Sequence, residues 1–232
     1  MKRVVILQPS YLPWLGYFDQ IYKADLFVFF DDVQYTRRDW RNRNRIKLQS
    51  GEVKYLTIPV KTKGKYNALI KDIEIDNDQN WAQSHVGMIR ENYKMMPYFN
   101  EFFPRIEELL LKQYKYLSDL DIESTKTIAG LLGIRDTKFA LSSETEANYQ
   151  SSTEHLVEIC KKHNATHYLT GDSAKDYLEE DMFKKAGIIV EYHGYSHPIY
   201  SQGGDEFVPY LSIIDLLFNE GGNSVEILAG SR

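Results

Sequence analysis

The sequence predicts an α/β protein with three layers, in which a mostly parallel, Rossmann-like sheet lies between helices. Short, uninterrupted apolar runs rich in β-branched residues alternate with segments of helical periodicity at both ends of the chain, which is the pattern of buried parallel strands joined by helices. The middle of the chain has mainly helical periodicity. A chain of 232 residues can bury a sizeable core. We therefore expect a single α/β domain over 1–232, with a helical insertion or cap at about 80–133.

The start of the chain predicts a strand–helix–strand unit. Residues 3–7 are the apolar run RVVIL, and residues 15–24 place Leu, Phe, Ile and Tyr at helical spacing. Pro13 stands just ahead of the second segment, where proline favours the start of a helix. A second apolar run, 26–32, ends in two aspartates. Two parallel strands joined by a helix form a right-handed crossover, so this unit sets the hand of the sheet.

The remaining elements are predicted from the periodicity of apolar residues, which differs between strands and helices. Strands are expected where short runs are apolar or alternate in polarity, and helices where apolar residues recur every three or four positions. The expected strands cover 53–60, 70–75, 138–143, 166–171 and 188–195. The expected helices cover 80–94, 99–133, 152–164, 174–187 and 207–222, and the second of them is expected to be interrupted at Pro104 and near 117–121.

Composition narrows the class of protein. A net charge of −5 argues against general binding of nucleic acid, which needs a basic surface. A single cysteine, Cys160, excludes an intrachain disulfide and a cysteine-rich zinc site. The apolar run at the start is too short for a signal peptide or a membrane span, so we expect a cytoplasmic protein without membrane insertion.

The six histidines do not predict a metal site. None has metal-ligand spacing, and the stretch HGYSH at 193–197 lacks an acidic partner in a helical frame. The chain also lacks both glycine-rich phosphate loops, GxxxxGK and GxGxxG, and the nucleophile elbow GxSxG.

Three polar segments follow expected strands: QPSYLPW at 8–14, DDVQYTRRDWRNRNRIK at 31–47, and TGDSAKDY at 170–177. Ligands of parallel sheets bind outside the carboxyl ends of the strands, so these segments predict a binding site at that edge. In the first segment two prolines and two large aromatic residues indicate a rigid wall more than a plain turn. The alternative remains that these are ordinary polar strand ends.

The second segment holds five arginines within 37–45. Arginine binds phosphate or carboxylate in a bidentate way, so this density favours a phosphate clamp over a solvated charged hairpin. In the third segment Gly171 permits close approach of the backbone, and the start of a helix there would attract an anion or simply be capped. The candidate substrate-binding residues are Gln8, Tyr11, Trp14, Gln34, Asn42, Arg43, Asn44, Arg45, Gly171 and Tyr177.

Three residues are candidates for a catalytic base. Asp31 and Asp32 end the second expected strand, and His85 lies on an amphipathic helix next to Trp81. Carboxylates and imidazoles are the usual proton acceptors in enzymes. His85 also has the alternative role of a histidine packed in the core.

The chain resembles the WbqC-like family, which occurs in bacterial gene clusters for O-antigen (lipopolysaccharide) and other surface glycans. The stretches that carry the resemblance lie in the family's order and span nearly the whole chain: QPSYLPWLGYFDQIYKADLFVFFDDVQYTRRDWRNRNRIK, LTIPV, HVGMIRENYKMMPYF, YLTGDSAKDYL and FVPYLSIIDLLFNEGG. One departure is Leu7, which stands where the family pattern has a histidine before Gln8 and Pro9.

The resemblance implies a role in glycan assembly and points to acylation or aminoacylation of an amino sugar. Our first hypothesis is a transferase that adds an acyl or aminoacyl group to the amine of a nucleotide-linked amino sugar. Tyr11 and Trp14 would stack on a ring, and Arg43 and Arg45 would hold the diphosphate. An acyl thioester, on coenzyme A or an acyl carrier protein, would be the donor, with no metal and no further cofactor implied, and a homo-oligomer is left open. The alternatives are an ATP-dependent nucleotidylyltransferase or amide ligase, and a non-enzymatic partner of a glycan-assembly enzyme.

Overall fold

The computed structural model describes residues 1–37, 39–65, 67–145, 150–204 and 206–230. Its centre is a five-stranded sheet in the order β5-β2-β1-β6-β7, and every neighbouring pair of strands is parallel. This confirms the predicted α/β class and the Rossmann-like layers. The strands are β1 (Arg3–Leu7), β2 (Leu26–Phe29), β5 (Lys138–Leu141), β6 (His167–Thr170) and β7 (Ile189–Tyr192).

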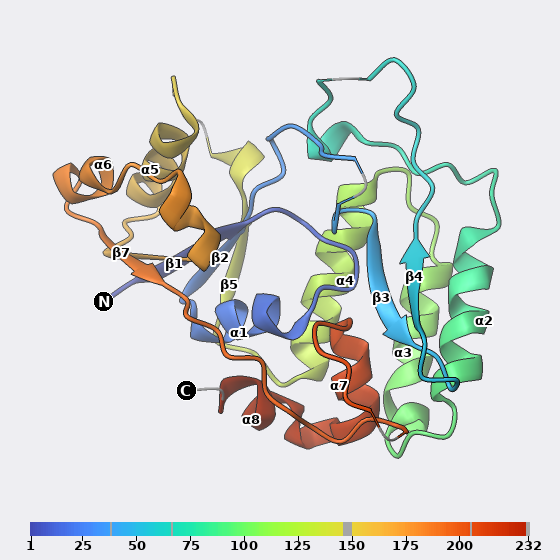
Figure 1. Ribbon diagram of the computed structural model, residues 1–232. Helices are drawn as coiled ribbons and strands as arrows, with labels where there is room; N and C mark the ends of the chain where they lie inside the picture. The colour runs from blue at the N-terminus through green and yellow to red at the C-terminus, as the bar shows by residue number, and fades with distance from the viewer. Residues whose placement is uncertain (38, 66, 146–149, 205, 231–232) are drawn as a thin grey trace.

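Helices cover both faces of the sheet, as Figure 1 shows. One face packs against α5 (Ser152–Lys162) and α6 (Glu180–Lys185) through a small core that includes Val4, Val28 and Cys160. The other face packs in a larger core that also takes in Val5 and Phe27. The helices of that larger core are α1 (Leu15–Lys23), α2 (Trp81–Tyr93), α3 (Phe99–Leu111), α4 (Leu117–Leu131), α7 (Ile213–Glu220) and α8 (Ser224–Ala229).

The alternation of side chains along β1 explains this sandwich. Val4 and Ile6 point to the core of α5 and α6, whereas Val5 points to the larger core, and all three are buried. A strand that is apolar at every position can be buried on both sides only in the middle of a layered sheet. The run RVVIL therefore places β1 at the centre.

A two-stranded antiparallel ribbon stands apart from the main sheet. It consists of β3 (Arg43–Lys47) and β4 (Val53–Thr57), and Figure 1 shows it beside α2 and α3. Its inner face buries Ile46 and Leu56. The ribbon and the three helices α2–α4 come from the part of the chain between β2 and β5, so the region expected as an insertion at about 80–133 holds α2, α3 and α4.

Several expected elements differ from the structure. The helix expected at 174–187 is reduced to α6 and the 3-10 turn before it. The interruption expected at Pro104 is wrong, because α3 continues through this residue. Residues 70–75 were expected as a strand, but they begin with the 3-10 turn η1 (Ile70–Asp72), because the core residues Ile70 and Ile73 are spaced by three. The last expected helix, at 207–222, starts only at Ile213. Tyr210 has a φ of 59°, which a helix does not allow.

The other short 3-10 turns are η2 (Ser142–Glu144), η3 (Asp172–Asp176) and η4 (Gly221–Asn223). In the described ranges, no helix combines the length and the apolar character needed to cross a lipid bilayer.

The close contact between Gly221, at the end of α7, and Tyr98 can be tested by mutation. Gly221 has a φ of 55°, and a Cβ added there would lie 2.4 Å from Cδ1 of Tyr98. Gly221→Ala should therefore lower the free energy of unfolding by about 2–4 kcal/mol, from left-handed backbone strain together with overpacking. Urea unfolding measures this change.

Gly222→Ala is the matched control, because a Cβ at Gly222 meets no atom within 4 Å. Its free energy of unfolding should stay within about 0.5 kcal/mol of the wild type. Equal stability of the two variants would contradict the packing described for Gly221.

Candidate functional site

A cavity of about 600 Å³ opens at the carboxyl ends of β1 and β6. From β1 the chain crosses to β2 on one side, whereas β6 pairs with the other side of β1. This reversal of strand order is the place where open α/β sheets bind their ligands. The sheet contributes Leu7 and Gln8 from the end of β1, Phe30 from beyond β2, and Thr170 and Gly171 from the end of β6.

The loop 8–14 forms one wall, and a strained residue sets its shape. Leu12 has a φ of 41°, which a leucine adopts only when its surroundings hold it there. Its carbonyl oxygen accepts two hydrogen bonds, from Nδ2 of Asn44 at 2.7 Å and from the hydroxyl of Ser212 at 2.8 Å. Asn44, a predicted binding residue that also lines the cavity, therefore anchors the loop as well.

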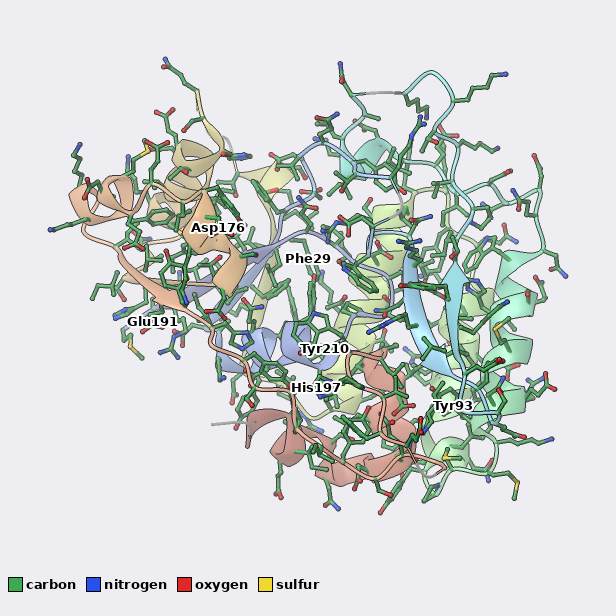
Figure 2. The ribbon with its side chains drawn as sticks, viewed as in Figure 1. Phe29, Tyr93, Asp176, Glu191, His197 and Tyr210 are labelled. Atoms are coloured by element: carbon green, nitrogen blue, oxygen red, sulfur yellow. The ribbon has the colours of Figure 1, made fainter. Side chains whose placement is uncertain are left out.

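Trp14 ends this loop and lies against the start of α1. A Cβ at Gly16 would lie 2.3–2.7 Å from atoms of the Trp14 ring, so the indole covers the position where a side chain would be. The ring also meets Tyr195 edge to face, with centroids 5.3 Å apart. Next to it, His197 and Tyr210 have ring centroids 5.0 Å apart (Figure 2). Trp14 thus presents a fixed aromatic surface to the cavity.

Tyr11 and His85 lie outside the described lining of the cavity. Tyr11 is fully buried, and its hydroxyl is 2.9 Å from Nδ1 of His85, which is itself only 5% exposed. The His85 ring also hydrogen-bonds to the backbone of Thr57, but burial dominates and lowers its pKa to about 4. The two residues tie the loop 8–14 to α2. Their proposed roles in stacking and proton transfer stay predictions.

Asp31 and Asp32 join the end of β2 to the end of β5. Asp31 accepts hydrogen bonds from the Ser142 hydroxyl at 3.0 Å, and from the backbone N–H and hydroxyl of Ser143 at 3.0 and 2.7 Å. Asp32 shares the single Ser142 hydroxyl hydrogen with Asp31, and its other oxygen lies 3.5 Å from Nε2 of His155. Asp31 and Asp32 are outside the described lining of the cavity, whereas Phe30 and Gln34, which stand on either side of them in the sequence, are part of it. The structure therefore gives both carboxylates structural partners.

Of the arginine-rich segment, Arg41 lines the cavity. It donates from Nη1 to the Ser10 hydroxyl at 2.7 Å and from Nη2 to Asp39 at 3.3 Å. Its pairing with Asp39 contributes to a lowered pKa of that carboxyl, against the opposing effect of burial. Trp40 beside it also lines the cavity.

Three predicted clamp residues lie on or beside the ribbon, outside that lining. Asn42 donates to the carbonyl of Ile58 at 2.8 Å. The guanidinium of Arg43 lies 4.8 Å from the ring centre of Tyr55. Arg45 donates to the carbonyls of Pro209 and Tyr210, at 3.3 and 2.9 Å. Arg38, from the same segment, lies outside the described residues.

The electrostatic surroundings of Arg41 include a buried carboxyl group. Asp121 on α4 is fully buried, and both of its oxygens lack a hydrogen-bond partner within the described ranges. Burial raises the pKa of Asp121 well above its usual value, and the charge of Arg41 opposes that rise. Gln8 and Gln20, which both line the cavity, likewise have a buried amide oxygen with no partner among the residues described. The two glutamine oxygens can accept hydrogen bonds from a ligand in the cavity.

The cavity brings together six of the predicted residues: Gln8, Trp14, Gln34, Asn44, Gly171 and Tyr177. Sequence reasoning missed several polar and aromatic lining residues: Ser10, Tyr17, Gln20, Trp40, Arg41, Ser152, Tyr168, Thr170 and Ser173. A signal existed for Trp40 and Arg41, because they stand beside the chosen arginines. The choice among neighbouring arginines depends on where the strand begins, and β3 begins only at Arg43.

The buried state of His85 predicts a pH dependence of stability. Its pKa is about 4 in the folded protein and about 6.5 in an unfolded chain. The unfolded state therefore binds more protons between these values. The stabilisation from the neutral ring is complete above pH 6.5 and declines by about 3 kcal/mol as the pH falls to 4.

Urea unfolding of the wild type and of His85→Asn across this range measures the effect. The stability difference between the two proteins should shrink as the pH falls, because only the wild type loses the contribution of His85. Parallel pH profiles would contradict the burial of a neutral His85.

Comparison with known proteins agrees with the resemblance noted in the sequence. The chain is 39% identical over 236 residues, covering 100% of both proteins, to "Uncharacterized protein Rv1507c" of Mycobacterium tuberculosis (strain ATCC 25618 / H37Rv). No solved structure matches the chain. The model of the WbqC-like protein family matches residues 8–227, so the chain belongs to the WbqC-like protein family.

Proposed function

We propose that this protein is a transferase of surface-polysaccharide biosynthesis that adds an acyl or aminoacyl group to the amine of a nucleotide-linked amino sugar. The observation that carries the proposal is the cavity at the reversal of strand order, which combines aromatic walls, amide groups and Arg41. Its volume of about 600 Å³ falls within the range of small-molecule sites. Membership of the WbqC-like family supports a role in glycan assembly.

The chemistry of the lining suits each part of such a substrate. Trp14, Trp40 and Tyr177 offer flat aromatic faces to a base or a sugar ring. Arg41 offers a guanidinium to the diphosphate. The amide oxygens of Gln8 and Gln20, which have no hydrogen-bond partner among the residues described, accept hydrogen bonds from hydroxyl or amino groups. The acyl donor is a thioester on coenzyme A or on a carrier protein.

A thermal-shift screen tests the substrate class. The screen compares UDP- and dTDP-linked sugars that carry a free amine, the free nucleotides, ATP with Mg²⁺, and acetyl-coenzyme A. A ligand at a hundred times its dissociation constant adds about 2.7 kcal/mol, which raises Tm by about 5–10 °C for a chain of this size. We expect a nucleotide-linked amino sugar to produce this shift.

Two arginine variants locate the diphosphate. Arg41→Ala should abolish most of the shift, because Arg41 lines the cavity. Arg43→Ala is the matched control and should retain the shift, because Arg43 lies over Tyr55 on the ribbon. The reverse result would move the diphosphate to the ribbon. A shift with ATP and Mg²⁺ alone would contradict the proposed substrate. The absence of a shift with every nucleotide tested would contradict it as well.

A further inference from the structure

A histidine and an aspartate from distant parts of the chain form a buried pair beside the cavity. His193 follows the last residue of β7, and its Nε2 lies 2.5 Å from Oδ2 of Asp19 on α1. The side chains of His193 and Asp19 are 4% and 0% exposed. Lys23, one turn further along α1, also donates to Oδ2 of Asp19. The stretch HGYSH thus has an acidic partner, which comes from another element.

Three contacts connect His193 with residues that line the cavity. Its backbone N–H donates to the carbonyl of Thr170 at 2.9 Å, and Asp19 is followed along α1 by Gln20. The imidazole stacks on Tyr195 with centroids 5.2 Å apart, and Tyr195 meets Trp14 edge to face. Thr170, Gln20 and Trp14 line the cavity, whereas His193 itself is outside the described lining and lies behind these residues.

The proposed reaction needs a proton acceptor that the lining itself does not provide. No aspartate, glutamate, histidine or lysine occurs among the described residues that line the cavity. The other nearby candidates have structural partners. His85 pairs with Tyr11, and Asp31 pairs with Ser142 and Ser143. Asp32 lies against Ser142 and His155. His197 is 2.8 Å from the carbonyl of Pro198 and accepts a hydrogen bond from the backbone of Tyr210.

We propose that His193, oriented by Asp19, takes the proton from the substrate amine; this inference rests on the proposed function. When Nε2–H donates to Asp19, Nδ1 becomes the acceptor of the ring. A buried carboxylate that fixes the tautomer and stabilises the imidazolium is the arrangement used for proton transfer to histidine in many enzymes. Asp19 is the positioning residue of the pair.

The reaction balances with an acyl thioester as the donor. The substrate ammonium first releases one proton to water. The neutral amine then attacks the thioester carbonyl, and Nδ1 of His193 takes the second proton from the attacking nitrogen. The C–N bond forms and the C–S bond breaks. The thiolate leaves and takes the proton from the imidazolium. The products are the amide and a thiol, and His193 returns to its neutral state.

Chemical modification tests whether His193 faces the ligand. Diethyl pyrocarbonate should modify His193 in the wild type, and mass spectrometry of peptides locates the modified residue. The UDP- or dTDP-linked amino sugar that gives the largest thermal shift should reduce this modification at least about tenfold when bound at a hundred times its dissociation constant. His167, at the opposite end of β6, is the internal control and should show no protection.

Kinetics of amide formation provides the second measurement. His193→Gln should lower kcat by about 10²–10⁴-fold and change KM less than threefold, which is the usual effect of removing a general base. Asp19→Asn should lower kcat by less, and His167→Gln should leave both constants unchanged. The thermal shift caused by the amino-sugar nucleotide should persist in His193→Gln.

The outcomes separate the two proposals. A thermal shift without protection of His193, or full kcat in His193→Gln, overturns the role of His193 and leaves the proposed function standing. No thermal shift from any amino-sugar nucleotide overturns the proposed function and this inference with it.

Discussion

The double hydrogen bond to the carbonyl of Leu12 holds together the parts of the molecule that form the site. Asn44 comes from the ribbon and Ser212 from the residue before α7, so one oxygen atom joins three segments far apart in sequence. Backbone bonds complete the junction, from Ser212 to Arg45 and from Ile213 to Pro13. A leucine at positive φ costs about 1–2 kcal/mol, and these bonds offset that strain. The position of Trp14, and with it the start of α1, follows from this junction.

The main sheet was predictable because its signal is local. The apolar run of β1 predicts a buried strand and the spacing after Pro13 predicts a helix, and the structure agrees with both. The edge of the sheet that binds ligands was predictable for the same reason, since topology fixes it. Gln8, Trp14 and Gly171 line the cavity because they stand directly after strands or in the first loop.

The roles of individual polar residues were much harder to predict. Tyr11, Asp31 and His85 have the right chemistry and lie near the right edge, yet their partners are other residues of the fold. Asp215 behaves in the same way, because the hydroxyls of Tyr93 and Tyr200 both bond to it inside the core. Most of these pairings join residues 74 to 122 positions apart in the sequence, which no local pattern records. The pairing of Asp19 with His193 has the same origin.

The contact between Trp14 and Gly16 restricts the order in which these positions can change. Gly16 has an ordinary backbone conformation, so the neighbouring indole, and not a special φ, excludes a side chain there. A substitution at position 16 that comes first must displace the indole from the cavity wall. A small residue at position 14 would instead remove the obstacle, and position 16 could then accept a side chain. Sequence drift at this pair is therefore directional, with position 14 changing before position 16.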